Sequence, residues 1–222
     1  MGRIRELLNH IGSWEVASRR RKMKRLAGRY AQWRAGGGEL PMPHYGKQLV
    51  VAEYAERFGP KVFVETGTYT GHMVLAMLDR FEQVYSIELD PVLYAKTRRM
   101  FMRHRHVHLL QGASEEVLPK VLEDVALPCL FWLDAHYSGG QTARGTLDTP
   151  ILLEVRCILR HRRADEHVLL IDDARSFTGR NDYPTLDELR NTILTAKPGW
   201  NFEVRDDIIR VHRPLAGRAG SV

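Results

Sequence analysis

Carboxylate side chains stand at the ends of several apolar runs in this sequence, and their positions predict a binding site. Glu65 ends "VFVE", Glu88 ends "VYSIE", Asp134 follows "CLFWL", and Asp172 and Asp173 follow "HVLLI". If these runs are parallel strands, all five carboxylates project into one crevice beyond the strands' carboxyl ends. Burying such a group without a partner is costly. One of them could be a helix N-cap, but five at a shared edge are more economically explained by a site.

A glycine turn follows the first of these carboxylates, in "VETGTYTG". Gly67 and Gly71 would let the backbone approach a ligand closely, although an ordinary tight turn would also use them. Glu88 follows Gly67 by 21 residues, about where a carboxylate meets ribose hydroxyls in a dinucleotide fold. The pattern GxGxxG is absent, which favours a nucleoside without phosphates over a pyrophosphate.

The three aspartates offer hard oxygen ligands on adjacent strand ends. Asp134, Asp172 and Asp173 together suit Mg²⁺, which keeps several waters and leaves positions for substrate oxygens. Such a cation would lower the pKa of a hydroxyl and hold it in line for reaction. The alternative is structural: Asp172 or Asp173 caps the following loop, and Asp134 pairs with an arginine.

The elements that must position these residues alternate along the chain. Apolar runs flanked by amphipathic helices indicate parallel strands that are covered on both faces. The last two runs have no helix between them, so we expect them to pair antiparallel. The prediction is an α/β fold: a Rossmann-like, doubly wound, seven-stranded sheet, mostly parallel with a C-terminal antiparallel hairpin strand, plus N-terminal helices. The expected strands lie within residues 61–66, 83–90, 107–112, 128–136, 167–174, 201–206 and 207–213.

The charge is unevenly distributed. Residues 1–38 hold ten Lys/Arg against Glu6 and Glu15, so their net charge is +8. The whole chain has a net charge of +6, so the remainder carries −2. We therefore divide the chain into a basic helical arm and linker (1–43), a main domain (44–213) and a flexible tail (214–222). The arm is expected to pack as a solvated helix on the domain or on a second subunit, giving a homo-oligomer through the N-terminal helices. Contact with an anionic membrane surface or with nucleic acid is the alternative.

Composition limits the compartment. No run of eighteen apolar residues predicts a membrane span, and the N-terminus lacks the apolar core of a secretory signal. Cys129 and Cys157 lie in apolar segments and form no CxxC, which indicates buried thiols in a reducing compartment. We expect a cytoplasmic protein, with a peripheral position at the inner membrane surface as an alternative.

These motifs resemble those of the class I S-adenosylmethionine (SAM)-dependent methyltransferases over most of the chain, from Val62 to Arg213. "VETGTYTG" looks like their first motif, "SIELD" like their second, and "GASEEVLPKVL" like the segment that lies along the adenine. "WLDAH" and "LLIDDA" are similar to the acidic pattern of the metal-dependent O-methyltransferases of the catechol and macrolide-sugar types. The resemblance implies SAM and Mg²⁺, or another divalent cation, as cofactors.

The resemblance also implies roles for particular residues. Glu65 would lie near the methionine amino group, Gly67 would pass under the methionine part, and Glu88 would accept from both ribose hydroxyls. Many members have an Asp where this chain has Ala113, so adenine recognition would rest on backbone groups and Ser114. The full set of expected cofactor-contacting residues is Glu65, Gly67, Thr68, Gly71, Glu88, Ala113, Ser114 and Asp134.

A base is needed to accept the hydroxyl proton, and two residues compete for that role. His136 lies two residues past Asp134 and has a suitable ordinary pKa, although a structural histidine bonded to a loop carbonyl is an equal alternative. Asp134 is the rival, since it could combine ligation with proton acceptance. The polar, glycine-rich loop after His136 is expected to face the substrate. The loop after the fifth strand, with Arg175, Arg180, Asp182 and Tyr183, is expected to form the opposite wall.

The resulting hypothesis is a SAM-dependent, Mg²⁺-assisted O-methyltransferase acting on a hydroxyl of a sugar or another small molecule. One alternative is an RNA or other macromolecule methyltransferase guided by the basic arm, although no Asn-Pro-Pro-Tyr type motif follows the fourth strand. The other alternative is a non-catalytic SAM-binding module, because a fold does not imply an activity.

Overall fold

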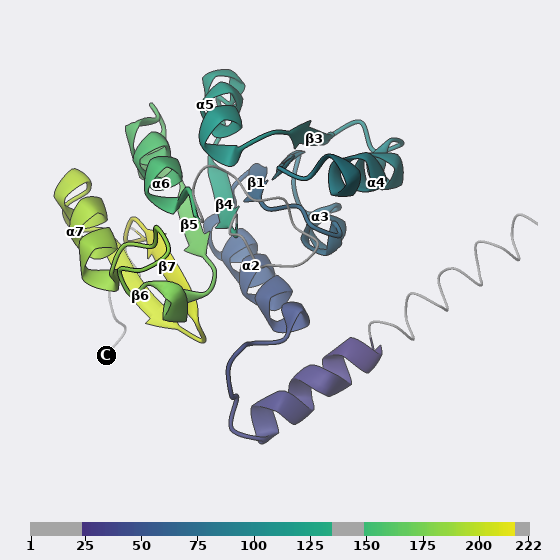
Figure 1. Cartoon of the computed structure of the whole chain (residues 1–222), viewed down its shortest axis with the longest axis horizontal. Coiled ribbons are helices and arrows are strands. Elements are labelled where there is room, and N and C mark those ends of the chain that lie inside the picture. The colour runs from purple at the N-terminus through teal and green to yellow at the C-terminus, as the bar shows by residue number, and fades with distance from the viewer. Residues whose placement is uncertain (1–23, 135–148, 216–222) are drawn as a thin grey trace, which may run out of the picture. The chain divides into compact units, whose positions relative to one another are not determined.

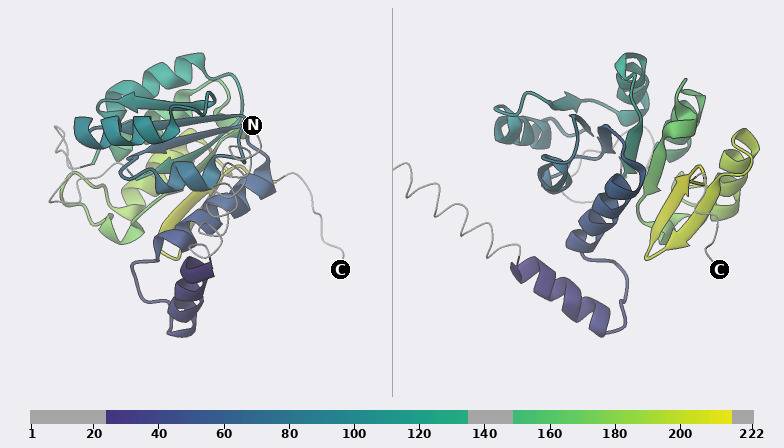
Figure 2. Two further views of the ribbon diagram at one scale, coloured as in Figure 1. Left: turned by 90° about the vertical axis from the view of Figure 1, so that its right-hand side faces the viewer. Right: turned by 180° about the vertical axis from the view of Figure 1, so that it is seen from behind.

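The computed structural model describes residues 24–134 and 149–215, and the chain divides into two compact units, residues 1–49 and 50–222. The division falls within helix α2 (His44–Phe58). The predicted boundary after residue 43 stays a prediction. Figures 1 and 2 show the second unit as a twisted sheet with helices on both of its faces.

The sheet has seven strands in the order β3-β2-β1-β4-β5-β7-β6. Strands β1 to β5 are parallel, and β7 runs antiparallel to both β5 and β6, so the predicted fold class is confirmed. The central strands are buried along their whole length because helices cover both faces. The bounds are β1 Val62–Thr66, β2 Gln83–Glu88, β3 Val107–Gln111, β4 Cys129–Leu133, β5 Val168–Ile171, β6 Asn201–Arg205 and β7 Ile208–His212.

Alternate side chains of the strands build two separate apolar layers. One face packs under α5, α6 and α7, which stand side by side in Figure 1, and Val64, Phe131 and Leu169 lie in this core. On β7, Val211 belongs to this face, whereas His212 points to the other face and contacts the rings of Tyr54 and Phe58 of α2. The remaining bounds are α3 His72–Met77, α4 Pro91–Phe101, α5 Ser114–Asp124, α6 Ile151–Arg160, α7 Leu186–Ala196, and the 3-10 turns η1 Ala164–Glu166 and η2 Ala174–Ser176.

Two helices begin one residue away from where their sequences suggest: α6 begins one residue later and α5 one residue earlier. Thr149 and Pro150 read as N-cap and first helical residue, but Pro150 is the N-cap of α6, and Thr149 Oγ1 accepts the Ile151 N–H from outside. Ala113, rather than Ser114, is the N-cap of α5. Ser114 is therefore the first residue of α5, and its side chain is not the N-cap.

The first unit contains a helix over residues 24–35, whose Tyr30 and Trp33 rings stack with centroids 5.5 Å apart. Trp33 Nε1 donates to the Glu39 carbonyl at 2.5 Å. Lys24, Arg25, Arg29 and Arg34 are exposed, while the rest of the basic run lies outside the described residues. The partner of this arm therefore stays a prediction. Within 24–134 and 149–215, no helix combines the length and apolar character needed to cross a membrane.

Two histidines form a chain of hydrogen bonds at the end of the sheet opposite the carboxylates. His167 Nδ1 accepts the Cys129 N–H at 3.1 Å, so its proton lies on Nε2, which donates to His161 Nδ1 at 2.7 Å. His161 then donates from Nε2 to the Val125 carbonyl at 3.1 Å. Both rings are neutral in this arrangement. Burial is the main cause that lowers the pKa of His167, to about 3.

Acid is expected to weaken the fold through His167. The pKa of His167 is lower in the folded chain than in the unfolded chain. Between pH 6.5 and 3 the unfolded chain therefore binds a proton that the folded chain does not, and the free energy of unfolding decreases as the pH falls. The unfolding free energies of wild type and His167→Asn should therefore approach each other by about 2 kcal/mol between pH 7.5 and 5. Urea unfolding at both pH values measures this. His72→Asn, at an exposed histidine, is the control, and a constant gap for His167→Asn would contradict the expectation.

Candidate functional site

Strand register brings the predicted carboxylates to one edge of the sheet. Thr66 pairs with Leu133, and Leu133 pairs with Ile171, so β1, β4 and β5 end at the same level. Two further bonds extend this alignment: Asp134 N donates to the Thr66 carbonyl and Asp172 N to the Leu133 carbonyl, both at 3.1 Å. The carboxylates that are 107 residues apart in the chain, Glu65 and Asp172, thus belong to the same rim.

Glu65 is buried at this rim and is held by a chain of hydroxyls. Ser86 Oγ donates to Glu65 Oε2 at 2.5 Å, and because that uses the only Ser86 proton, Thr68 Oγ1 donates to Ser86 Oγ at 2.6 Å. Burial raises the pKa of Glu65 well above its ordinary value, the Ser86 bond opposes this, and the charges of Asp134 and Glu88 add to it. A cationic group at the rim would therefore be favoured by several carboxylates at once.

Glu88 spans the turn after β1 and the start of α4. Its Oε2 accepts the Tyr69 N–H at 2.7 Å, and its Oε1 accepts the Asp90 N–H at 2.9 Å. Burial raises the pKa of Glu88, and these two backbone bonds lower it. Each carboxylate oxygen has two lone pairs, so one acceptor position on each oxygen is left for a ligand hydroxyl.

The turn after β1 contains two glycines with left-handed backbone conformation. Gly67 and Gly71 have φ values of 86° and 72°, in the left-handed region that favours glycine. At Gly71 a Cβ atom would lie 2.8 Å from the Phe101 ring of α4, so packing against α4 also requires glycine. Contact of these two glycines with a cofactor stays a prediction.

Gly71→Ala is expected to destabilise the protein more than Gly59→Ala does. Both glycines have left-handed backbone conformation, with φ of +72° at Gly71 and +63° at Gly59, but nothing lies within 4 Å of a Cβ atom at Gly59. The backbone penalty of about 1 kcal/mol is shared, and the Phe101 clash should add about 1–2 kcal/mol at Gly71. Urea unfolding of the two variants measures the difference. Equal losses would show that the Phe101 ring moves aside freely.

A buried carboxylate of α6 lies beside the expected adenine end of the site. Glu154 is 1% exposed, and its Oε1 has no hydrogen-bond partner among the described residues. Burial raises its pKa to about 7, while the neighbouring Ser114 and Thr66 hydroxyls lower it. Ala113 and Ser114 thus open α5 next to a carboxyl group that the sequence analysis did not consider.

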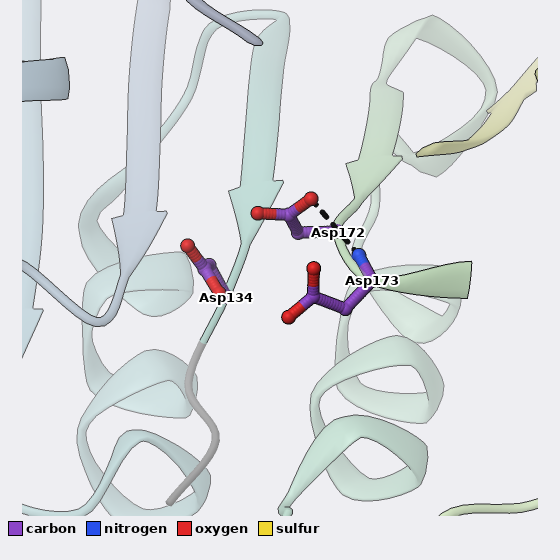
Figure 3. Close-up of side chains that lie close together, drawn as sticks. All are labelled: Asp134, Asp172 and Asp173. Atoms are coloured by element: carbon purple, nitrogen blue, oxygen red, sulfur yellow. Dashed lines mark hydrogen bonds between the residues drawn. The ribbon is translucent and has the colours of Figure 1, made fainter. Parts of the chain in front are cut away.

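The three aspartates converge into one cluster, shown in Figure 3. One carboxylate oxygen from each of Asp134, Asp172 and Asp173 lies within 4.8 Å of the others. Asp172 Oδ1 accepts the Asp173 N–H at 2.9 Å, and its other oxygen points toward Asp134. Oxygen ligands on opposite sides of Mg²⁺ lie about 4.2 Å apart, so small side-chain rotations would complete a shared coordination sphere. The donor set therefore fits a hard divalent cation.

The alternative to a cation site was that these aspartates cap a loop or pair with an arginine. Asp173 is the N-cap of η2 but its side chain makes no capping bond, and the Asp172 side chain accepts the N–H of the next residue. The arginine in the cluster is Arg175, whose Nη1 lies 2.9 Å from Asp173 Oδ1. An arginine thus pairs with Asp173, and the alternative of an arginine beside Asp134 stays a prediction.

Of the two loops expected to form the walls of the site, the one after β5 lies within the described residues. Tyr183 is half-buried against Phe177, and burial raises its pKa, with the Asp173 and Asp134 charges adding to the effect. The predicted place of Tyr183 in the wall of the site stays a prediction. Arg180 and Asp182 are exposed in the same loop. His136 and the loop that follows it, to residue 148, lie outside the described residues.

Three residues near the site were missed by the sequence analysis. Ser86 carried a signal, because it is a polar residue two positions before Glu88 and so on the same face of β2. Glu154 carried a weaker one, as a lone acid on the apolar face formed by Ile151, Val155 and Ile158. Asp207, which contacts Arg175, carried none.

No family model matches the chain, and no curated protein matches it significantly. Among solved structures, it is similar to an O-methyltransferase from Bacillus cereus in complex with S-adenosylhomocysteine (SAH), with TM-score 0.56 and 13% identity over 84% of this chain and 90% of that one. It is also similar to SAH-bound PaMTH1 of Podospora anserina, with TM-score 0.54 and 18% identity over 85% and 87%. TomG, an O-methyltransferase of Streptomyces achromogenes, gives 0.54 and 13% over 84% and 87%.

At these identities the likeness concerns the fold. The chain has the Rossmann-like fold of class I SAM-dependent methyltransferases, and solved O-methyltransferases are among the structures that share it. The fold that the sequence resemblance implied is therefore confirmed.

Proposed function

We propose that this protein is a SAM-dependent O-methyltransferase, assisted by a divalent cation such as Mg²⁺, that methylates a hydroxyl of a sugar or another small molecule. One observation carries the proposal: two sets of carboxylates, one suited to a nucleoside and one to a cation, meet at a single sheet edge in this fold. Ligands of open α/β sheets bind at this edge.

The nucleoside end would be held by β1, β2 and the start of α5. Glu88 has a free acceptor position on each oxygen for the two ribose hydroxyls, and its backbone bonds fix its orientation. Glu65 would face the amino group of the cofactor, directly or through water, with Ser86 and Thr68 holding its carboxylate in place. SAM bound there would supply an electrophilic methyl group.

The acceptor end would be built by Asp134, Asp172 and Asp173. These residues would hold the cation, with Asp172 contributing the oxygen that the Asp173 N–H does not use. A cation there supplies Lewis acidity, which lowers the pKa of an acceptor hydroxyl. Asp134 or His136 would accept the proton that the acceptor hydroxyl loses when it takes the methyl group. Tyr183 would line the acceptor's side of the crevice.

Calorimetry and turnover test the proposal in sequence. SAM and SAH are titrated into the folded protein, and methyl transfer to a panel of sugars and catechols is then followed with Mg²⁺ and with EDTA. The proposal expects micromolar cofactor binding and EDTA-sensitive methylation of at least one acceptor. Folded protein that binds neither nucleoside would overturn it. Cofactor binding without turnover on any hydroxyl acceptor would support the non-catalytic module, and salt-sensitive RNA binding would support the macromolecule methyltransferase.

A further inference from the structure

The hairpin turn between β6 and β7 contains two aspartates in a conformation that favours glycine. Asp206 and Asp207 have φ values of 52° and 63°, which is the pattern of a two-residue type I′ turn. Asn-Gly is the favoured pair in such turns, so Asp207 stands where glycine would cost least. The two side chains differ in their surroundings: that of Asp206 is 49% exposed, whereas that of Asp207 is 3% exposed.

Asp207 contacts the turn that carries the acidic cluster through three of its atoms. Its carbonyl oxygen accepts the Ala174 N–H at 2.9 Å, and its Oδ1 accepts the Arg175 N–H at 2.8 Å. Its Oδ2 pairs with the Arg175 guanidinium. The hairpin thus fixes both the backbone of η2 and the side chain of Arg175.

Arg175 connects Asp207 to the cluster. The same Nη1 that pairs with Asp207 lies 2.9 Å from Asp173 Oδ1. A single cation is therefore shared between a buried carboxylate of the hairpin and one member of the acidic cluster. Without Asp207, Arg175 would interact with Asp173 alone. Its guanidinium could then bind both oxygens of the Asp173 carboxylate at once.

We propose that Asp207 is a positioning residue for the cation site: it holds Arg175 so that Asp173 keeps an oxygen available for a divalent cation. This inference rests on the cation part of the proposed function. Partners of metal ligands orient them, and their loss typically weakens metal affinity by about 10- to 100-fold. The strained backbone of Asp207 fits this role, because glycine would suit the turn but would have no side chain with which to hold Arg175.

Two matched variants test the role of Asp207. Asp207→Asn and Asp206→Asn each remove one negative charge from adjacent positions of the same turn. The dissociation constant of Mn²⁺, a cation that also prefers oxygen ligands, is measured by calorimetry on the full chain, together with the melting temperature without metal. Asp207→Asn should weaken Mn²⁺ binding roughly tenfold. Asp206→Asn should leave it within about twofold, since its carboxylate contacts neither Arg175 nor the cluster by any bond described here.

A double variant separates positioning from simple loss of charge. In Arg175→Met/Asp207→Asn the competing guanidinium is gone as well, so Mn²⁺ affinity should return to within about threefold of wild type. Equal affinities of the two single variants, or a double variant as weak as Asp207→Asn, would overturn the role of Asp207 while leaving the cation site intact. If wild type binds no Mn²⁺, or if Asp172→Asn binds Mn²⁺ as tightly as wild type, the proposed cation site is wrong and so is this inference.

Discussion

Replacing Asp172 with asparagine is expected to reduce cation-dependent methyl transfer by at least about 100-fold. The asparagine oxygen can still accept the Asp173 N–H, so the local backbone contact survives. The oxygen that points toward Asp134 is replaced by an amide group, which is a poor partner for a cation. Lewis-acid assistance is worth several kcal/mol, and each 1.4 kcal/mol is about tenfold in rate. The measurement is the rate of methyl transfer in saturating SAM as a function of Mg²⁺ concentration.

The same variant should fold at least as stably as wild type in the absence of metal. Three carboxylates within 4.8 Å repel one another, and removing one charge relieves that repulsion. Asp165→Asn is the control for the same substitution away from the site. Asp165 lies on η1 and forms an ion pair with Lys197. EDTA should reduce the wild-type rate by the same factor as Asp172→Asn. A rate that neither EDTA nor Asp172→Asn changes would remove the cation from the mechanism.

Glu88→Gln is expected to weaken SAM and SAH binding by roughly 10- to 100-fold. The amide keeps one acceptor oxygen and replaces the other by a donor, so one ribose hydroxyl loses its acceptor and the backbone bond from Tyr69 or Asp90 is disturbed. Hydrogen bonds to a charged group contribute about 1.5–3 kcal/mol. Calorimetric titration of SAH at pH 7.5 measures the effect.

Glu82→Gln provides the matched control for this change. Glu82 precedes the same strand but forms an exposed ion pair with Lys61, so its loss should leave SAH affinity unchanged. Because burial raises the pKa of Glu88, wild-type affinity should begin to fall, as the pH is lowered, at a pH above the ordinary value for a glutamate. The variant should lack that part of the pH dependence. Identical SAH affinities for wild type and Glu88→Gln would place the ribose elsewhere.

The carboxylates of the site divide into two groups by their neighbours. Glu65 and Glu88 are bonded to hydroxyl and backbone donors, which fix their orientation. Asp134 and Asp172 lie together with Asp173, whose nearest cation is shared with Asp207. This division agrees with the two proposed tasks, holding a nucleoside and holding a cation, and it explains why one sheet edge carries so many acids.

The sequence by itself determined the layers, the strand directions and the edge at which the carboxylates gather. Continuous apolar runs such as "CLFWL" and "HVLLI" can be stable only as strands covered on both faces, and a carboxylate directly after such a run must lie at the strand's end. The absence of a helix between residues 205 and 208 fixed the terminal hairpin. These inferences depend on local patterns and were correct, whereas the N-caps expected at Thr149 and Ser114 were each wrong by one residue.

Only the tertiary structure decided which groups meet. Ser86 reaches Glu65 because β1 and β2 pair with Glu65 opposite Ser86, a register that neither strand encodes alone. Asp207 reaches Arg175 because β7 folds back beside β5, 32 positions along the chain. Glu154 is buried because α6 packs on α5 above the sheet. Such contacts depend on packing between segments distant in the sequence, and the energy of any one pair is too small to leave a local pattern.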